Sequence, residues 1–404
     1  MKSTFSALRL TSGYRSVRVL ITWYTIIRDG SFCAISLTAF SLFLMTMFSG
    51  CNRGPDTTQT DASLVVLEIK TLRGPGDNLK DIIEDVGFQR LEVTSGSLIR
   101  EISSMTYINE EIFIINNRDP NGHYTELLRF NNRGDFLNQV GQRGRAPGEI
   151  IDPRDLVITD TVIDVWSGLK ISRFTLDGVF IEDVFPAHFA GVGFIREGDN
   201  YLMYHGATPP HMFTKRNASG NIVESYHPYD RPFETITDGD GAIRYETGVS
   251  FYSSAYDTVY AYTEAGISPS VIFNYVDTES PFQASKRAKT VPDLISSQMG
   301  ILKIWNFLEN KDHIFIRYSM RRDFYYILYN KNENHAYYFT GSDKCSLRGI
   351  SFNNKAPVVL TDCNGLGFPY SYQEVQDDPY LRSLQLPEGS DSEDFFLVMF
   401  RLRK

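Results

Sequence analysis

Two arginines, Arg143 and Arg145, lie in the glycine-rich segment Gly141–Glu149 and are candidate contacts for an anion or another ligand. The segment lacks the Gly-Lys-Ser/Thr ending with which a phosphate-binding loop holds a phosphate and magnesium. Its Pro147 and Gly148 predict a type II turn, in which glycine supplies the positive φ. The sequence leaves two interpretations: a plain turn, or a turn whose arginines contact an anionic ligand.

Metal ligands are sparse in this sequence. The loop Asp238–Gly241, with Glu246 close by, offers oxygen ligands for calcium but not the spacing of an EF-hand. Asp and Gly are also frequent turn residues, so a plain turn is the alternative. The seven histidines form no His-Glu-x-x-His pair, and the closest two, His205 and His211, flank a proline-containing loop. We therefore predict no bound metal, with calcium as the one alternative.

Catalytic patterns are also missing. The chain has no Gly-x-Ser-x-Gly turn to hold a nucleophilic serine. Asp152 and Asp155 could do acid–base chemistry only if the fold brought their carboxyl groups together. The sequence identifies no catalytic residue, and it favours a protein that is not an enzyme.

The net charge of the chain is −9, and it is unevenly distributed. Residues 1–50 hold five basic side chains and one acid, which leaves 35 basic and 48 acidic residues, or −13, for the remainder. Nucleic-acid binding requires basic surface that replaces counterions, so the acidic body argues against a nucleic-acid partner. Aromatic residues make up 13% of the chain, which is typical of half-buried β-sheet surfaces.

The N-terminal region has the pattern of an export signal. Scattered arginines precede an uncharged, mostly apolar run, Cys33–Phe48, which ends at Ser49, Gly50 and Cys51. Small residues directly before a cysteine resemble a bacterial lipobox, which implies cleavage before Cys51 and lipidation of its sulfur. The acyl chains would then attach the protein to a membrane without a spanning helix. The alternative is an uncleaved signal or transmembrane anchor, although the run is shorter than the ~20 residues of a spanning helix.

Three regions follow from this interpretation. We expect a lipoprotein signal peptide over 1–50, a flexible polar tether over 51–61 and a folded domain over 62–404, located in the cell envelope and facing the periplasm or the surface. The remaining cysteines, Cys345 and Cys363, form an even pair in an exported chain. They could form a disulfide or remain two reduced thiols.

The folded domain contains an internal repeat. Phe130 begins a polar turn that ends in glycine and is followed by an aromatic residue, and the same pattern recurs 44 residues later at Phe174. Weaker copies follow at 216–222, 262–267 and 327–335. Short apolar runs bounded by turn residues, such as Ile112–Asn117 and Val162–Trp166, predict strands. A β repeat of this period is typical of a propeller blade.

These repeats predict an all-β, six-bladed β-propeller with four-stranded blades. We expect the N- and C-terminal strands to close the ring, with Leu64–Ile69 joining the blade that ends in Phe395–Leu402. Phe88–Val93 is a further predicted strand. Ser280–Gln283 has a capping-box pattern with proline at the first helical position, which predicts a small helical insertion.

Residues 153–180 resemble an NHL-type blade, and Gly141–Glu149 is similar to a linker in the six-bladed β-propeller lipoproteins of Bacteroides-like bacteria. The C-terminal Arg401–Lys404 resembles the ending of that family. The resemblance implies an exported propeller whose ligand is undefined, and it transfers no catalytic residues.

Three functions remain compatible with the sequence. The first is a lipid-anchored, non-enzymatic binding or scaffold module for a peptide, a glycan or an envelope protein. The second is a metal-dependent lyase or hydrolase with its site at the propeller axis. The third is a structural partner in an envelope complex, because a fold does not determine a function.

Overall fold

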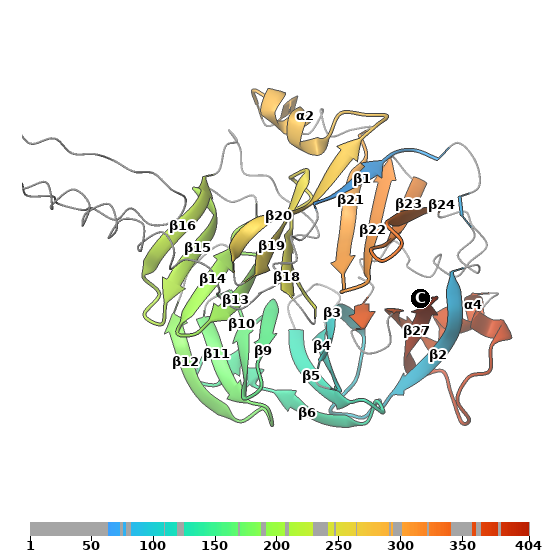
Figure 1. Cartoon of the computed structure of the whole chain (residues 1–404). Helices are drawn as coiled ribbons and strands as arrows, with labels where there is room; N and C mark the ends of the chain where they lie inside the picture. The colour runs from blue at the N-terminus through green and yellow to red at the C-terminus, as the bar shows by residue number, and fades with distance from the viewer. Residues whose placement is uncertain are drawn as a thin grey trace, which may run out of the picture. The chain divides into compact units, whose positions relative to one another are not determined.

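The computed structural model describes residues 64–72, 76–77, 82–108, 110–118, 125–168, 170–186, 191–206, 210–228, 241–245, 248–263, 265–290, 292–293, 301–320, 323–340, 358–360, 365–378 and 381–403. The chain divides into two units, Met1–Asp61 and Ala62–Lys404, and all of these residues belong to the second. Six antiparallel sheets form the blades of a six-bladed β-propeller, which confirms the predicted fold (Figure 1).

Each blade has four antiparallel strands, to which blade four adds a fifth, and the first of the four is the innermost, because first strands of neighbouring blades contact one another. Blade one contains β3 (Glu101–Ile108), β4 (Glu111–Asn117), β5 (Thr125–Asn131) and β6 (Phe136–Val140). Blade two contains β9 (Asp155–Ile158), β10 (Val162–Trp166), β11 (Lys170–Thr175) and β12 (Phe180–Pro186). Blade three contains β13 (Gly193–Glu197), β14 (Asn200–Tyr204), β15 (His211–Asn217) and β16 (Ile222–Pro228).

The second half of the ring repeats this order. Blade four contains β17 (Gly241–Tyr245), β18 (Gly248–Tyr252), β19 (Thr258–Thr263) and β20 (Gly266–Tyr275). Blade five contains β21 (Lys303–Glu309), β22 (His313–Met320), β23 (Asp323–Asn330) and β24 (His335–Thr340). The closing blade contains β25 (Val358–Leu360), β26 (Gly365–Ser371), β27 (Phe395–Leu402) and, as its outermost strand, β2 (Ile83–Leu91).

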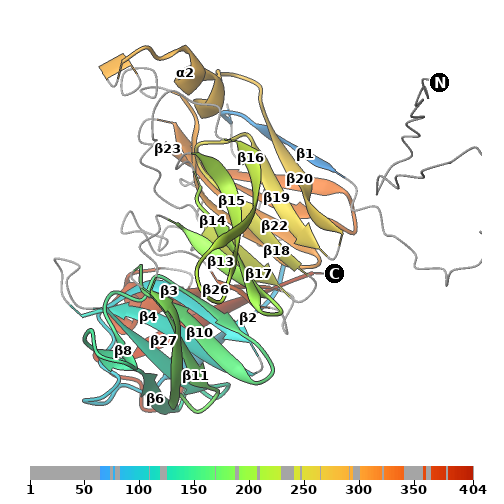
Figure 2. The same cartoon turned by 90° about the vertical axis from the view of Figure 1, so that its left-hand side faces the viewer.

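Strands from the two ends of the domain close the ring, as predicted, but the N-terminal partner differs from the expected one. β2 pairs antiparallel with β27, from Ile83 opposite Leu402 to Leu91 opposite Phe395 (Figure 1). The expected partner, Leu64–Ile69, instead forms β1 (Val65–Ile69) and adds to β20 as a fifth, parallel strand of blade four (Figure 2). The physical reason is burial, because Leu67 and Ile69 enter the core between blades four and five.

Two described parts of the segment between β1 and β2 contact blade five. Tyr318 donates a hydrogen bond to the Lys70 carbonyl at 2.8 Å. Further along, the backbone of Asp77 donates to the Tyr338 carbonyl at 2.7 Å, and the Asp77 carboxylate accepts from the Tyr338 N–H at 2.7 Å. The N-terminal segment therefore contacts three consecutive blades.

The repeated turns at Phe130 and Phe174 have the same structure. In each, the glycine N–H bonds back to a carbonyl three residues earlier, and the glycine φ is positive, +84° at Gly134 and +79° at Gly178. The flanking aromatic rings meet edge to face, with centroids 5.6 Å apart for Phe130 and Phe136. A β-bulge precedes each turn, which is the known pairing of a bulge with a left-handed glycine.

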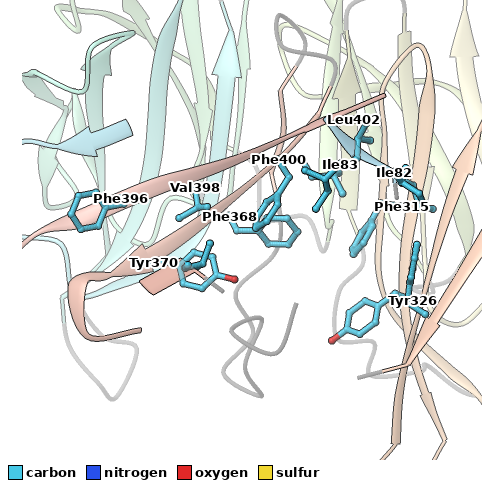
Figure 3. Close-up of a cluster of buried hydrophobic side chains, with 14 of the residues drawn as sticks. Ile82, Ile83, Phe315, Tyr326, Phe368, Tyr370, Phe396, Val398, Phe400 and Leu402 are labelled. Atoms are coloured by element: carbon cyan, nitrogen blue, oxygen red, sulfur yellow. The ribbon is translucent and has the colours of Figure 1, made fainter. Parts of the chain in front are cut away.

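The core consists of apolar clusters between neighbouring blades. Figure 3 shows the cluster between blade five and the closing blade, where Phe368 contacts Phe315 edge to face, with centroids 6.2 Å apart. Phe396, Val398 and Phe400 of β27 belong to the same cluster, so the closing strand is held by side chains as well as by its backbone.

The predicted insertion forms α2 (Pro281–Arg287), which begins after the N-cap Ser280, whose hydroxyl accepts from the Gln283 N–H. Phe282 packs on Tyr256 of blade four. A second helix, α4 (Tyr372–Asp377), and the 3-10 turn η3 (Leu381–Ser383) lie between β26 and β27 and were not predicted. Within the described ranges, no helix is long and apolar enough to cross a membrane.

A candidate functional site on blade five

The predicted anion contacts Arg143 and Arg145 lie in a small substructure between blades one and two. Arg143 is in β7 (Gln142–Arg143), which pairs in parallel with β8 (Glu149–Ile150), and both arginines are exposed. The turn between β7 and β8 follows Arg145 and is closed by a hydrogen bond from the Glu149 N–H to the Ala146 carbonyl, at 2.9 Å. Gly148 has a φ of +77°, which confirms the predicted turn geometry. Anion binding by these arginines stays a prediction.

Several other predicted residues lie outside the described part of the chain. These are the lipidation site Cys51, the cysteine pair Cys345 and Cys363, and the possible calcium ligands Asp238, Asp240 and Glu246. In the described ranges, no group of three or more His, Cys, Asp or Glu side chains is arranged to hold a metal ion.

The two aspartates considered for acid–base chemistry have separate partners. Asp155, on the inner strand β9, accepts two hydrogen bonds of 2.8 Å from Arg244 on β17, the inner strand two blades away. It also accepts from the Phe194 N–H at 3.1 Å, and Arg244 donates to the Phe194 carbonyl. Asp152 pairs with the exposed Arg154 at 3.1 Å. The Asp155 carboxylate therefore joins three inner strands.

A polar row crosses the face of blade five that packs toward the closing blade. Asn306 on β21, Arg317 on β22 and Tyr326 on β23 are cross-strand partners, so their side chains share one face of the sheet. Phe315, two residues before Arg317, lies on that face in the apolar cluster of Figure 3. The row thus continues the apolar contact between the two blades with hydrogen-bonding groups.

A β-bulge between Ile304 and Asn306 adds an aromatic residue to this face. The extra residue is Trp305, whose indole N–H donates to the Ser319 hydroxyl at 2.6 Å. Bulges re-aim side chains on the bulged strand, and here the indole turns toward the row that contains Arg317. Trp305 is half-buried, and the inner strand therefore carries a partly accessible aromatic face.

The cations on this face contact aromatic rings. The Lys303 ammonium lies 4.1 Å from the Trp305 ring centroid, and the Arg317 guanidinium lies 5.6 Å from that of Phe324. Trp305 and Phe324 are themselves 6.5 Å apart at an interplanar angle of 41°. We call Lys303, Trp305, Asn306, Arg317, Ser319, Phe324 and Tyr326 the blade-five site.

Arg317 is the unusual member of the blade-five site. It is 4% exposed, and its Nε atom is buried without a hydrogen-bond partner, as is Oδ1 of Asn306. Burial lowers the pKa of the Arg317 guanidinium, because desolvation disfavours its charge. Burial raises the pKa of Tyr326, and the nearby arginine opposes that shift.

Two other arginines of the sheets, Arg129 and Arg173, have carboxylate partners. Arg129, the second buried arginine among the described residues, donates to Glu111 at 2.7 and 2.5 Å. The less buried Arg173 donates to Asp164 at 2.8 and 3.3 Å. Among the described residues, no carboxylate pairs with Arg317, in contrast to Arg129 and Arg173.

None of the blade-five residues was predicted from the sequence. A usable signal was present, because Phe315, Arg317 and Ser319 alternate within a strand that is otherwise mostly apolar. Such alternation places a charge and a hydroxyl on the same face as a buried ring. A second signal was Trp305, which lies two residues after Lys303 and directly before Asn306.

The fold is similar to solved structures of two Bacteroides proteins. A protein of Bacteroides fragilis described as exported matches with a TM-score of 0.66 and 16% identity, over 85% of this chain and 100% of that one. A member of the DUF4221 family from Bacteroides vulgatus matches with a TM-score of 0.50 and 11% identity, over 80% of this chain and 97% of the other. At these identities the similarity concerns the fold alone.

No curated protein matches the chain. A family model does match, over residues 65–377, which include five complete blades, both N-terminal strands and α4. The matched range omits β27, although that strand is needed to close the ring. The chain belongs to the family described as domain of unknown function DUF4934.

Proposed function

We propose that this protein is a non-enzymatic binding module of the bacterial cell envelope, and that the blade-five site contacts its ligand. The observation that carries the proposal is the bulge that turns half-buried Trp305 toward the polar row of blade five. Flat aromatic faces beside hydrogen-bonding groups are typical of ligand-binding surfaces. Asp155 is paired with Arg244, so its carboxylate has a structural role rather than a catalytic one in this proposal.

The envelope location and the lipid anchor at Cys51 are part of this proposal. The apolar run followed by Ser49, Gly50 and Cys51 supports them, and so does the similarity in fold to a protein described as exported. The ligand would then be a molecule of the envelope or of the surrounding medium, such as a glycan, a peptide or another envelope protein.

Trp305 makes the binding proposal directly measurable. The chain has three tryptophans, of which Trp23 lies in the predicted signal peptide and Trp166 is 1% exposed in blade two. The fluorescence of Trp305 should therefore respond to a ligand at the blade-five site. The test is titration of the full chain with polygalacturonate, with dextran and with a mixture of short envelope-derived peptides.

We expect quenching or a blue shift with at least one of these probes, and its loss in Trp305→Phe. Trp166→Phe is the matched control and should retain the response. A chain that binds none of the probes, or a Trp305→Phe variant that binds them as wild type does in a pull-down assay, would contradict a binding function at this site.

A further inference from the structure

We propose that Arg317 binds the carboxylate of an acidic sugar whose ring lies against Trp305, an assignment that rests on the proposed binding function. The ligand class is a glycan that contains hexuronate residues. Arg317 would form the charged hydrogen bonds, with the Asn306 amide and the Tyr326 hydroxyl on either side of it in the cross-strand row.

The first argument is the missing counter-charge. A buried ion is strongly unfavourable unless it is paired and hydrogen-bonded, and Arg317 is more buried than Arg129, which has two bonds to Glu111. The Phe324 ring contact supplies only part of the compensation. An oxygen anion from outside the chain would supply the rest.

The second argument is the hydrogen-bonding capacity of the row. A guanidinium presents parallel N–H groups that match a carboxylate, and its Nε–H is without a partner here. The adjacent Asn306 also has an unbonded oxygen, which can accept from a sugar hydroxyl. Figure 3 shows the hydroxyl of Tyr326 pointing away from the apolar cluster. Carboxylate and hydroxyl groups on one ligand would satisfy all three side chains.

The third argument is the gradient of exposure. Arg317 is buried, whereas Lys303, Trp305 and Phe324 on the same face are half-buried. A ligand that reached Arg317 with its carboxylate would therefore leave its body against the rings. Aromatic side chains favour the flat apolar face of a sugar, and Lys303 adds a second positive charge for an acidic chain.

The test compares D-glucuronate with D-glucose, which differ in the carboxylate, against the full chain and its Arg317→Met, Arg317→Lys and Trp305→Phe variants. Calorimetry measures binding, and thermal unfolding in an anion-poor buffer measures stability. Wild type should bind glucuronate at least 10-fold more tightly than glucose, and Arg317→Met should weaken glucuronate binding by roughly 10- to 100-fold. Arg317→Lys should keep only part of the affinity, because it loses the paired N–H groups.

Stability separates a ligand-binding arginine from a structural one. Arg317→Met should have a Tm equal to or above that of wild type, because an unpaired buried charge is removed. The matched control Arg129→Met should have a lower Tm, because it leaves Glu111 without its partner. A fall in the Tm of Arg317→Met as large as that of the control would overturn the assignment.

Binding outcomes are also decisive. Equal affinities for glucuronate and glucose, or glucuronate binding unchanged in Arg317→Met, would refute the role of Arg317. Acetate or a short aspartyl peptide that binds as tightly as glucuronate would refute the sugar. If polygalacturonate binds Arg317→Met normally but not Trp305→Phe, the binding function stands and the carboxylate assignment fails; if wild type binds no probe at all, the binding function itself fails.

Discussion

Replacement of Asp155 by asparagine should destabilise the ring through three of its inner strands. The carboxylate accepts two hydrogen bonds of 2.8 Å from Arg244 and one of 3.1 Å from the Phe194 N–H. Asparagine can still accept from Phe194 but cannot neutralise Arg244. The guanidinium would remain on β17 with its Phe194 carbonyl bond and without its counter-charge.

The magnitude follows from burial. Removing one partner of a buried ion pair costs about 3–5 kcal/mol, and side-chain exposures of 13% for Asp155 and 19% for Arg244 favour the lower end, about 3 kcal/mol. The unit Ala62–Lys404 has 343 residues. At about 2.1 cal/mol/K per residue, its unfolding entropy is about 0.7 kcal/mol/K, so the Tm should fall by about 4 °C.

The assay is a double-mutant cycle by thermal unfolding of the full chain, with Asp155→Asn, Arg244→Met and their combination. The double variant should recover part of the loss, because no unpaired charge remains. Asp135→Asn is the control, since its pair with Arg133 is mostly exposed and should contribute below about 1 kcal/mol. Additive effects of the two substitutions would refute the argument that Asp155 and Arg244 act as a unit.

Three further predictions concern other parts of the chain. Gly178→Ala should lower the free energy of unfolding by about 1–2 kcal/mol because of the φ of +79° at this position. The loss should be larger still because an added Cβ would lie 2.4 Å from Nδ2 of Asn138, and urea unfolding measures the sum of the two effects. Burial lowers the pKa of His227 below 6.5, so the unfolded state binds the proton more readily than the folded state. The free energy of unfolding should therefore fall as the pH drops from 6.5 through the folded pKa. Urea unfolding at several pH values should show a smaller change of this free energy with pH in His227→Asn. Cys51→Ala should abolish palmitate labelling of the protein expressed in a bacterium that processes lipoproteins.

Each of these predictions has a sharp control. Gly198 has a similar φ, +61°, and an added Cβ there would have nothing within 4 Å. Gly198→Ala should therefore lower the free energy of unfolding less than Gly178→Ala does. Equal losses would contradict the contact with Asn138. A pH slope that is unchanged in His227→Asn would assign the dependence to another group. Labelling that persists in Cys51→Ala would exclude this cysteine as the lipidation site.

The repeat was predictable because its residues act locally. A polar turn closed by glycine and flanked by aromatic residues forms the same hairpin at Gly134 and Gly178, whatever the rest of the ring does. The helix α2 was predictable for the same reason, since Ser280 and Pro281 act within one turn. The helix α4 had an equally local signal, a capping box formed by Ser371 and Glu374.

Closure and the blade-five site depended on long-range contacts. Two N-terminal strands, β1 and β2, have patterns that suit an outer strand, and only the position of their apolar partners decides that β2 meets β27. Arg317 became a candidate because, among the described residues, it is buried without an acidic partner, and the sequence contains 49 acids that could have been that partner. The sequence around Arg317 does not show whether a carboxylate from elsewhere in the chain lies beside it.

The pairing of β2 with β27 also sets the order in which the molecule can assemble. Leu91 and Phe395 face each other across the two strands but are 304 residues apart in the chain. Joining ends that distant costs about 5 kcal/mol of loop-closure entropy, which the interior blades must first reduce by forming. The ring is therefore expected to close last, as a slow step late in folding, and a growing chain would present the edge of its newest blade until β27 has been synthesised.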